Sequence, residues 1–317
     1  MARRRMSRFS RLSATTRRGP NKAFPIVISV LAFFVLSVVI SVAVGLALSG
    51  RVDEYEEEKK FDFQKVEYVS GNKTVRSVEA YHFTKGASPA DYVSQKIWDL
   101  SVMARDCDGD LQFAFDTASI FPIDTVESDR SFKALCSDAD EEGARVCAYM
   151  YVTSLSIEDE YARDTAMAYE IALISEMAAS GADDILLLGI EVNENNISDV
   201  CEFVSRASLA ADKTPLGVAL SPEVYYLTEK EIYLAGMVRR SCDYLAVDLT
   251  YMTLEDGKST GKSEDGEALP SLLEETVRRL KFYISEYPAR LLFSRDDHKL
   301  YVDAVELGVL YYQILDK

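Results

Sequence analysis

This chain of 317 residues has little of what metal and redox sites are built from. Its two histidines, His82 and His298, lie far apart without a cysteine nearby, so we expect no zinc site or other metal centre. The five cysteines show no regular spacing, which is untypical of a disulfide scaffold and predicts buried free thiols. No P-loop and no C-x-x-C motif occurs, so nucleotide-dependent and thiol redox chemistry have no support and we expect no cofactor.

Acidic residues are missing from the first 48 positions. Residues 1–22 carry eight Lys and Arg residues, and Ile26–Leu48 is an uncharged apolar run of 23 residues. As a helix, this run would measure about 35 Å, enough to cross a bilayer core of about 30 Å. Because basic flanks stay on the cytoplasmic side, we predict a cytoplasmic tail over 1–22 and one transmembrane helix over 23–49. A cleaved signal ending near Ala47-Leu48-Ser49 is the alternative.

The part after this span is strongly acidic. Only 27 of the 35 Lys and Arg residues follow the span, whereas all 52 Asp and Glu residues do, so the net charge there is about −25. This charge argues against nucleic acid or anionic phospholipid as a ligand and leaves neutral or cationic ligands. We predict a charged stalk over 50–70, an extracellular domain over 71–317, and a location in a cell membrane with residues 26–48 in the lipid bilayer.

From about residue 75 the chain alternates between short β-rich runs and longer helical patterns. This alternation predicts βαβ units and a parallel sheet, and about seven units favour an α/β TIM-type barrel over a doubly wound fold. An eighth strand is not recognisable, so the barrel is either incomplete or closed by Phe63–Val69. The predicted strands are Val75–Tyr81, Leu111–Asp116, Arg145–Val152, Ile185–Val192, Leu216–Leu220, Tyr244–Thr250 and Arg290–Ser294, and the predicted helices are Pro89–Ala104, Asp129–Glu142, Ile157–Ser180, Ile197–Ala211, Thr228–Arg240, Leu269–Tyr287 and Val302–Leu315.

Acids and aromatic residues gather where the predicted strands end. In TIM barrels the active face is built from these positions, and glycoside hydrolysis needs two carboxyl groups about 5–10 Å apart. We therefore take Glu191 as the candidate proton donor, with Asp248 or Asp116 as the second carboxylate. Such acids also cap helices or form ion pairs, and tyrosines also fill cores. The candidate sugar-contacting residues are Tyr81, Tyr151, Tyr225 and Tyr251.

One segment resembles a known family. Asp184-Ile-Leu-Leu-Leu-Gly-Ile-Glu191 has the length of the D-x-x-D-x-D-x-E strand of family-18 glycoside hydrolases, the chitinase-like barrels. The terminal Glu, which is the family's general acid, matches Glu191, whereas Leu187 and Gly189 replace the two inner acids. More broadly, the layout is similar to glycoside-hydrolase-like barrels on membrane-anchored proteins of Gram-positive bacteria.

This resemblance implies a membrane-anchored domain that acts on or binds polysaccharide of the cell envelope. The alternative is a catalytically inactive barrel that serves as a glycan-binding or protein-docking module, with an envelope protein as its partner. Loss of the two inner acids favours this alternative, and the polar strand ends favour a site of some kind.

Overall fold

The computed structural model describes residues 68–316 apart from 71, 77, 121–123, 223–228, 262–268, 279–289, 298 and 307–311. The predicted transmembrane helix and nearly all of the predicted stalk lie outside the described residues. Among the helices that the structure does describe, none is both long and apolar enough to cross a membrane.

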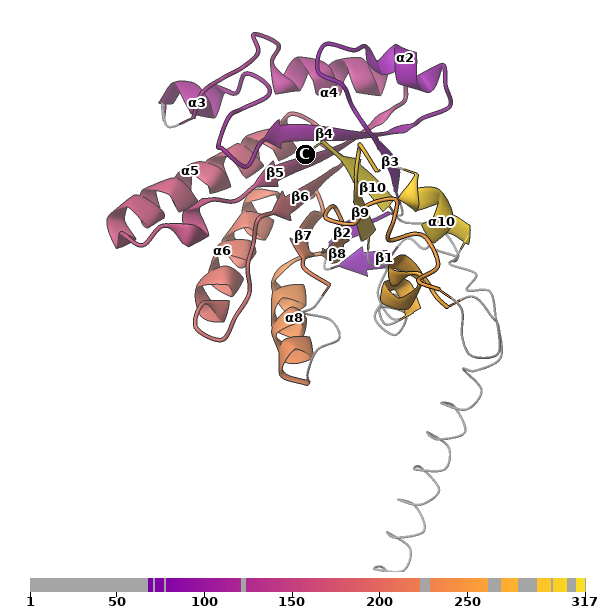
Figure 1. Ribbon diagram of the computed structural model, residues 1–317. Coiled ribbons are helices and arrows are strands. Elements are labelled where there is room, and N and C mark those ends of the chain that lie inside the picture. The colour runs from indigo at the N-terminus through magenta and orange to yellow at the C-terminus, as the bar shows by residue number, and fades with distance from the viewer. Residues whose placement is uncertain are drawn as a thin grey trace, which may run out of the picture. The chain divides into compact units, whose positions relative to one another are not determined.

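Eight parallel strands form a closed barrel, which confirms the TIM-type fold (Figure 1). The last strand pairs with both its predecessor and the first strand, so the barrel is complete. The expectation of an incomplete barrel is therefore wrong. The barrel strands are β3 (Glu79–His82), β4 (Asp99–Arg105), β5 (Arg145–Tyr151), β6 (Asp184–Leu188), β7 (Leu216–Leu220), β8 (Tyr244–Asp248), β9 (Arg290–Ser294) and β10 (Tyr312–Leu315).

Two of these strands were expected to be helical. All of β4 except Arg105 lies within the predicted helix Pro89–Ala104, and β10 lies within the predicted helix Val302–Leu315. Both strands are buried on nearly every position, and a short apolar run of this kind does not distinguish a buried strand from a buried helix. The predicted strand Leu111–Asp116 is also wrong, because Leu111 forms only isolated bridges and Asp116 begins a helix.

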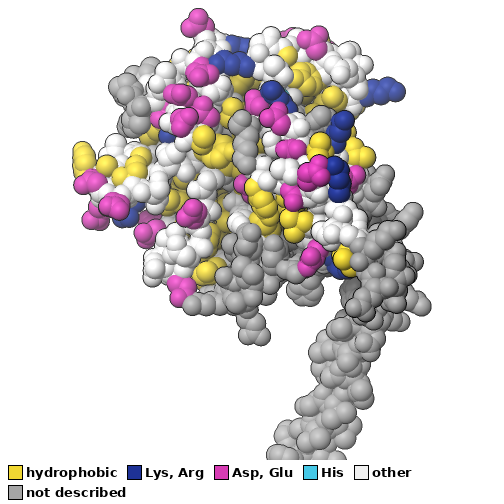
Figure 2. All heavy atoms as spheres, viewed as in Figure 1, with side chains coloured by type: hydrophobic (Ala, Val, Ile, Leu, Met, Phe, Trp, Pro, Cys, Tyr) yellow, Lys and Arg dark blue, Asp and Glu magenta, His cyan; other side chains and the backbone are white. Residues whose placement is uncertain are grey.

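Helices surround the barrel and bury one face against it (Figure 1). In α6, for example, the buried residues Val200, Phe203, Val204 and Ala207 recur at helical spacing. Acidic side chains are spread over the face drawn in Figure 2, in keeping with the excess of Asp and Glu. The described helices are α2 (Pro89–Val93), α3 (Asp116–Ile120), α4 (Phe132–Glu141), η2 (Ser154–Ser156), α5 (Glu160–Ala179), α6 (Ile197–Ala210), α8 (Glu229–Ser241) and α10 (Leu300–Glu306).

The barrel interior is filled by side chains. Leu186, Leu188, Tyr149 and Leu292 belong to one buried cluster, separate from the larger shell between strands and helices. Because side chains alternate along a strand, the residues between them face the helices. The interior is therefore a packed core and not a channel.

A polar layer lies among the interior side chains near the N-terminal end of the barrel. The guanidinium group of Arg290 donates to both carboxylate oxygens of Asp184 at 3.0 Å and to Gln313 Oε1 at 2.7 Å. The hydroxyl group of Tyr244 also donates to Asp184, at 3.1 Å. All four residues are buried, so this layer joins strands β6, β8, β9 and β10.

A two-stranded hairpin, β1 (Tyr68–Ser70) and β2 (Lys73–Val75), lies at this N-terminal end. Val75 packs into the interior cluster, and the buried Lys73 Nζ lies 3.0 Å from Asp243 Oδ2. The hairpin begins inside the segment 50–70 that was assigned to the stalk. The strand β1 overlaps Phe63–Val69, but it pairs with β2. The barrel is closed by β10, which pairs with β3.

Candidate functional site

We call the end of the barrel where β3–β10 terminate the mouth. Two predicted site residues, Tyr151 and Asp248, lie together there. Tyr151 packs against the interior cluster, and Asp248 follows Tyr244 and Ala246 at alternate positions of β8. Burial, with a further contribution from the charge of Asp248, raises the pKa of Tyr151 to about 12. Its phenol is therefore a hydrogen-bond donor at neutral pH.

Asp248 is held in place by its own turn. Its Oδ1 accepts hydrogen bonds from the backbone N–H of Thr250 at 2.9 Å and from the Thr250 hydroxyl at 2.6 Å. The carboxylate keeps further acceptor positions, because each oxygen carries two lone pairs. The half-buried Asp248 can thus accept hydrogen bonds from a ligand hydroxyl.

Glu191 lies at the same end of the barrel. It comes three residues after the end of β6, whereas Asp248 is the last residue of β8. β7 lies between these two strands, so the paired backbones of β6 and β8 are about 10 Å apart at a strand spacing of about 4.8 Å. Glu191 is exposed, and its carbonyl oxygen accepts a hydrogen bond from Asn196.

The side chains of the strand before Glu191 do not all point in the directions that the family-18 motif would require. Asp184, Leu186 and Leu188 point inward, whereas Leu187 packs in the outer shell. Gly189 then leaves the strand with a φ of +75°, where a Cβ would lie 3.1 Å from the carbonyl oxygen of Val152. Leu187, which occupies the first inner acid position of the motif, therefore faces the helices and not the barrel interior.

Asp116 is not with these residues. It is exposed at the first turn of α3, where its backbone N–H donates to Glu176 Oε1 at 2.6 Å. Glu176 is in the last turn of α5, which returns from the mouth towards the start of β6. Asp116 thus lies in the outer helical layer, away from Glu191 and Asp248.

The other tyrosines have different surroundings. Tyr81 points away from the interior, because its ring meets Tyr301 of α10 and Tyr312 edge-on and its oxygen lies 3.0 Å from the Tyr312 hydroxyl. Tyr251 is 48% exposed just beyond β8. Tyr225 lies outside the described residues.

Sequence reasoning missed a charged group at the mouth. Arg295 Nη1 lies 3.2 Å from Asp316 Oδ1, and His82 Nε2 lies 3.5 Å from Asp316 Oδ2. Desolvation by burial lowers the pKa of His82, so its imidazole is neutral at pH 7. These residues end β9, β10 and β3, and they could not be grouped while β10 was assigned to a helix.

A second missed network positions Tyr151. Arg105, at the end of β4, donates to the backbone carbonyl of Tyr151 at 2.7 Å and pairs with the buried acids Asp124 and Glu170. Burial alone would lower the pKa of Arg105, but the bonds to the two acids outweigh it and raise that pKa. Glu170 also accepts a bond from the Ser154 hydroxyl. The network ties β4, β5 and α5 together behind the mouth.

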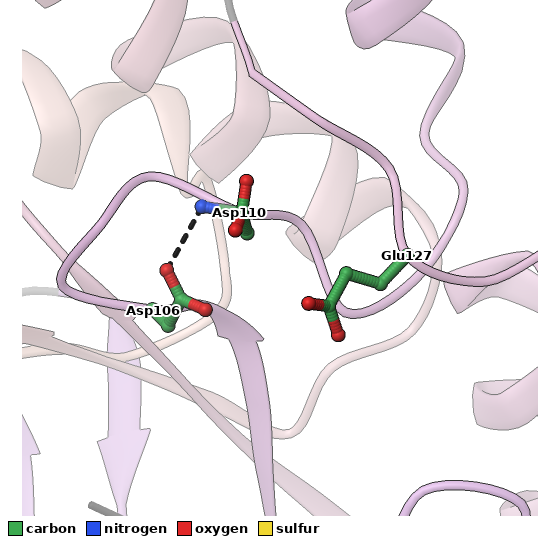
Figure 3. A group of neighbouring side chains, drawn as sticks. All are labelled: Asp106, Asp110 and Glu127. Carbon is green, nitrogen blue, oxygen red and sulfur yellow. Dashed lines mark hydrogen bonds between the residues drawn. The ribbon is translucent and has the colours of Figure 1, made fainter.

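Two acids of the loop after β4 lie close to a third acid from the segment between α3 and α4 (Figure 3). Ligand oxygens of Asp106, Asp110 and Glu127 all lie within 4.8 Å of one another. Two of the three carboxylates already have partners, since Asp106 accepts from the backbone N–H of Asp110 at 2.8 Å and Lys85 Nζ lies 2.8 Å from Glu127. We read this group as part of the loop's own hydrogen bonding.

All five cysteines are free thiols, as predicted. Cys136, Cys147 and Cys242 are buried, and burial raises the pKa of each. The expectation of burial does not hold for Cys107, which is exposed, or for Cys201, which is partly buried.

The loop after β8 contains Gly257-Lys258-Ser259-Thr260-Gly261, the G-x-S-x-G spacing of many serine hydrolases. In those enzymes the serine lies on a sharp turn between a strand and a helix. Here Ser259 is exposed in an irregular loop, and its hydroxyl lies within hydrogen-bonding distance of the carbonyl groups of Gly261 and Leu269. This segment is therefore not a nucleophile elbow.

Comparison with known proteins finds distant structural neighbours and no family. No family model and no curated protein matches the chain. A GH113 β-1,4-mannanase is 8% identical, with 76% of this chain and 88% of that chain covered and a TM-score of 0.48. D-psicose 3-epimerase from Clostridium cellulolyticum H10 is 12% identical, with 75% and 83% covered and a TM-score of 0.44. A class V chitinase from Pseudomonas fluorescens Pf-5 is 15% identical, with 68% of each chain covered and a TM-score of 0.39.

Proposed function

We propose that the mouth of the barrel is a carbohydrate-binding site on a domain that is anchored to the outer face of a cell membrane. The observation that carries this proposal is that Tyr151 and Asp248 both occupy inward-facing positions at the mouth, close enough for the charge of Asp248 to raise the pKa of Tyr151. Tyr151 supplies a hydrogen-bond donor, and Asp248 supplies an acceptor. Sugar hydroxyl groups need both, and aromatic rings such as the exposed Tyr251 offer faces on which sugars stack.

The charge of the protein is compatible with a neutral glycan. Acids outnumber basic residues, which opposes the binding of nucleic acid and other polyanions. The predicted anchor at residues 26–48 would place this site next to the polysaccharides of a cell envelope. Deletion of residues 26–48 should release the protein from alkali-washed membranes, and retention after deletion would contradict the anchor.

The binding test uses the full chain in non-ionic detergent with peptidoglycan and with insoluble chitin. Co-sedimentation with one of these glycans is expected, and Asp248→Asn should reduce the bound fraction at least fivefold. The matched control is Asp164→Asn, on the exposed surface of α5, which should bind as the wild type does. Equal binding by all three proteins, or no binding to any glycan, would refute the proposal.

Glycoside hydrolysis is a second candidate, favoured by two acids at the mouth: Glu191, three residues beyond the end of β6, and Asp248, at the end of β8. Release of new reducing ends by the wild type, and its loss in Glu191→Gln, would establish hydrolysis with Glu191 as the acid. Binding without release in either protein would leave a catalytically inactive glycan-binding barrel.

A further inference from the structure

A cavity of about 370 Å³ lies at the N-terminal end of the barrel, opposite the mouth. Its walls come from the β1–β2 hairpin, the starts of β5 and β6, and the turn before β7. The volume is within the range of about 300–1,000 Å³ that is usual for small-molecule sites. The proposed carbohydrate site makes no use of this cavity.

Arg145 supplies a fixed cation in the wall. Its Nε and Nη2 donate to the two carboxylate oxygens of Asp99 at 2.5 and 2.7 Å. This two-pronged bond holds the guanidinium plane in one orientation. Within the described part of the chain, Nη1 has no hydrogen-bond acceptor and remains able to donate to a ligand.

Two further cations line the cavity. Lys213 is exposed in the turn before β7, and Arg76 follows the hairpin. Three cationic side chains around one cavity are unexpected in a chain whose net charge is −17. An arrangement that runs against the overall charge favours a specific local anion over non-specific attraction.

The two acids of the wall are compensated. Asp184 is bonded through both oxygens to Arg290. Asp183 Oδ2 accepts a hydrogen bond from the backbone N–H of Val146 at 2.8 Å. Burial raises the pKa of Asp183, which disfavours its negative charge. Asp184 is therefore neutralised by Arg290, and Arg145 is paired with Asp99. Lys213 thus supplies the exposed positive charge of the cavity, and Arg145 supplies an oriented donor.

We propose that this cavity binds a small oxyanion, a phosphate or carboxylate group, between Arg145 and Lys213. A guanidinium group that is already oriented matches the paired oxygens of such groups, and the lysine adds a mobile point charge. The anion belongs either to a free metabolite or to the headgroup of an acidic phospholipid.

Calorimetric titration of the full chain in non-ionic detergent with inorganic phosphate, at constant ionic strength, tests the site. Saturable binding of one phosphate per chain is expected. Lys213→Glu should weaken it at least tenfold, whereas Lys133→Glu, the same change on the exposed face of α4, should leave it within twofold. Absence of saturable binding, or equal weakening by both changes, would overturn the proposal.

Arg145→Lys keeps the positive charge and removes the paired N–H donors of the guanidinium group. It should weaken phosphate binding at least fivefold if the cavity recognises paired oxygens. Circular dichroism establishes that this variant is folded. Unchanged binding by the folded variant would contradict the role of Arg145. Competition with soluble short-chain phosphatidylglycerol separates the two sources, because displacement of phosphate indicates a headgroup and its absence a free anion.

Discussion

Arg290 offers a severe test of how the barrel is held together. It is 3% exposed, bonds both oxygens of Asp184 and Gln313, and its guanidinium carbon lies 4.5 Å from the centroid of the Tyr244 ring. Arg290→Met would preserve the length of the side chain and remove its charge. Asp184 would then remain buried as a carboxylate with Tyr244 as its remaining side-chain donor.

Removal of one partner from a buried ion pair costs about 3–5 kcal/mol, because the remaining charge is left uncompensated. We expect Arg290→Met to lower the free energy of unfolding by about that amount. The double variant Asp184→Leu, Arg290→Met removes both charges and should be more stable than Arg290→Met alone. Arg278→Met is the control, since its pair with Glu274 is exposed and should contribute less than about 0.5 kcal/mol.

Urea unfolding of the full chain in non-ionic detergent, followed by circular dichroism, measures these differences. The ordering of the single and double variants carries more weight than any one value. A loss below about 1 kcal/mol for Arg290→Met, or a double variant whose loss equals the sum of the two single losses, would refute an uncompensated charge as the cause.

Four other substitutions test the same structure. Gly217→Ala would place a Cβ 2.2 Å from the Tyr244 ring and should destabilise the fold by about 2–3 kcal/mol, whereas Gly236→Ala, in open space on α8, should stabilise it by about 0.5–1 kcal/mol in the same urea experiment. Burial lowers the pKa of His82 below its ordinary value of 6.5, so the unfolded chain binds the proton first and stability is lost as the pH falls below 6.5. The loss between pH 7 and pH 5 should be smaller in His82→Gln, and equal slopes would contradict this cause. Lys73→Met removes the cation that joins the hairpin to the barrel and should cost about 3 kcal/mol, with earlier proteolysis near residue 72 as a second readout.

The strands that the sequence predicted well share one property. Leu216–Leu220 and Arg290–Ser294 were located to the residue, because turn residues precede each run and the runs are short and apolar. Asp99–Arg105 failed because the helix-compatible segment before it continues into it without a Gly or Pro to mark the boundary. Because this strand was not recognised, the second βα unit was assigned wrongly to Leu111–Asp116.

The site was less predictable for a different reason. Sequence position tells which residues follow a strand, but the direction of a side chain depends on where the strand begins its alternation. Tyr81 and Tyr151 both lie in barrel strands, yet one faces α10 and the other faces the interior. Arg105, Asp124 and Glu170 are far apart in the chain, so only the fold reveals that they meet behind Tyr151.

The two proposed sites lie at opposite ends of an interior that is filled with side chains. Tyr149, Leu186 and Leu292 occupy the middle of the interior, and the Asp184–Arg290 layer lies between them and the N-terminal end of the barrel. A ligand at one end therefore has no path to the other and no shared charge network with it. We expect Lys213→Glu to leave glycan co-sedimentation unchanged and Asp248→Asn to leave phosphate binding unchanged. If either variant impaired both activities while remaining folded, the two ends would be coupled, and the filled interior would not separate them.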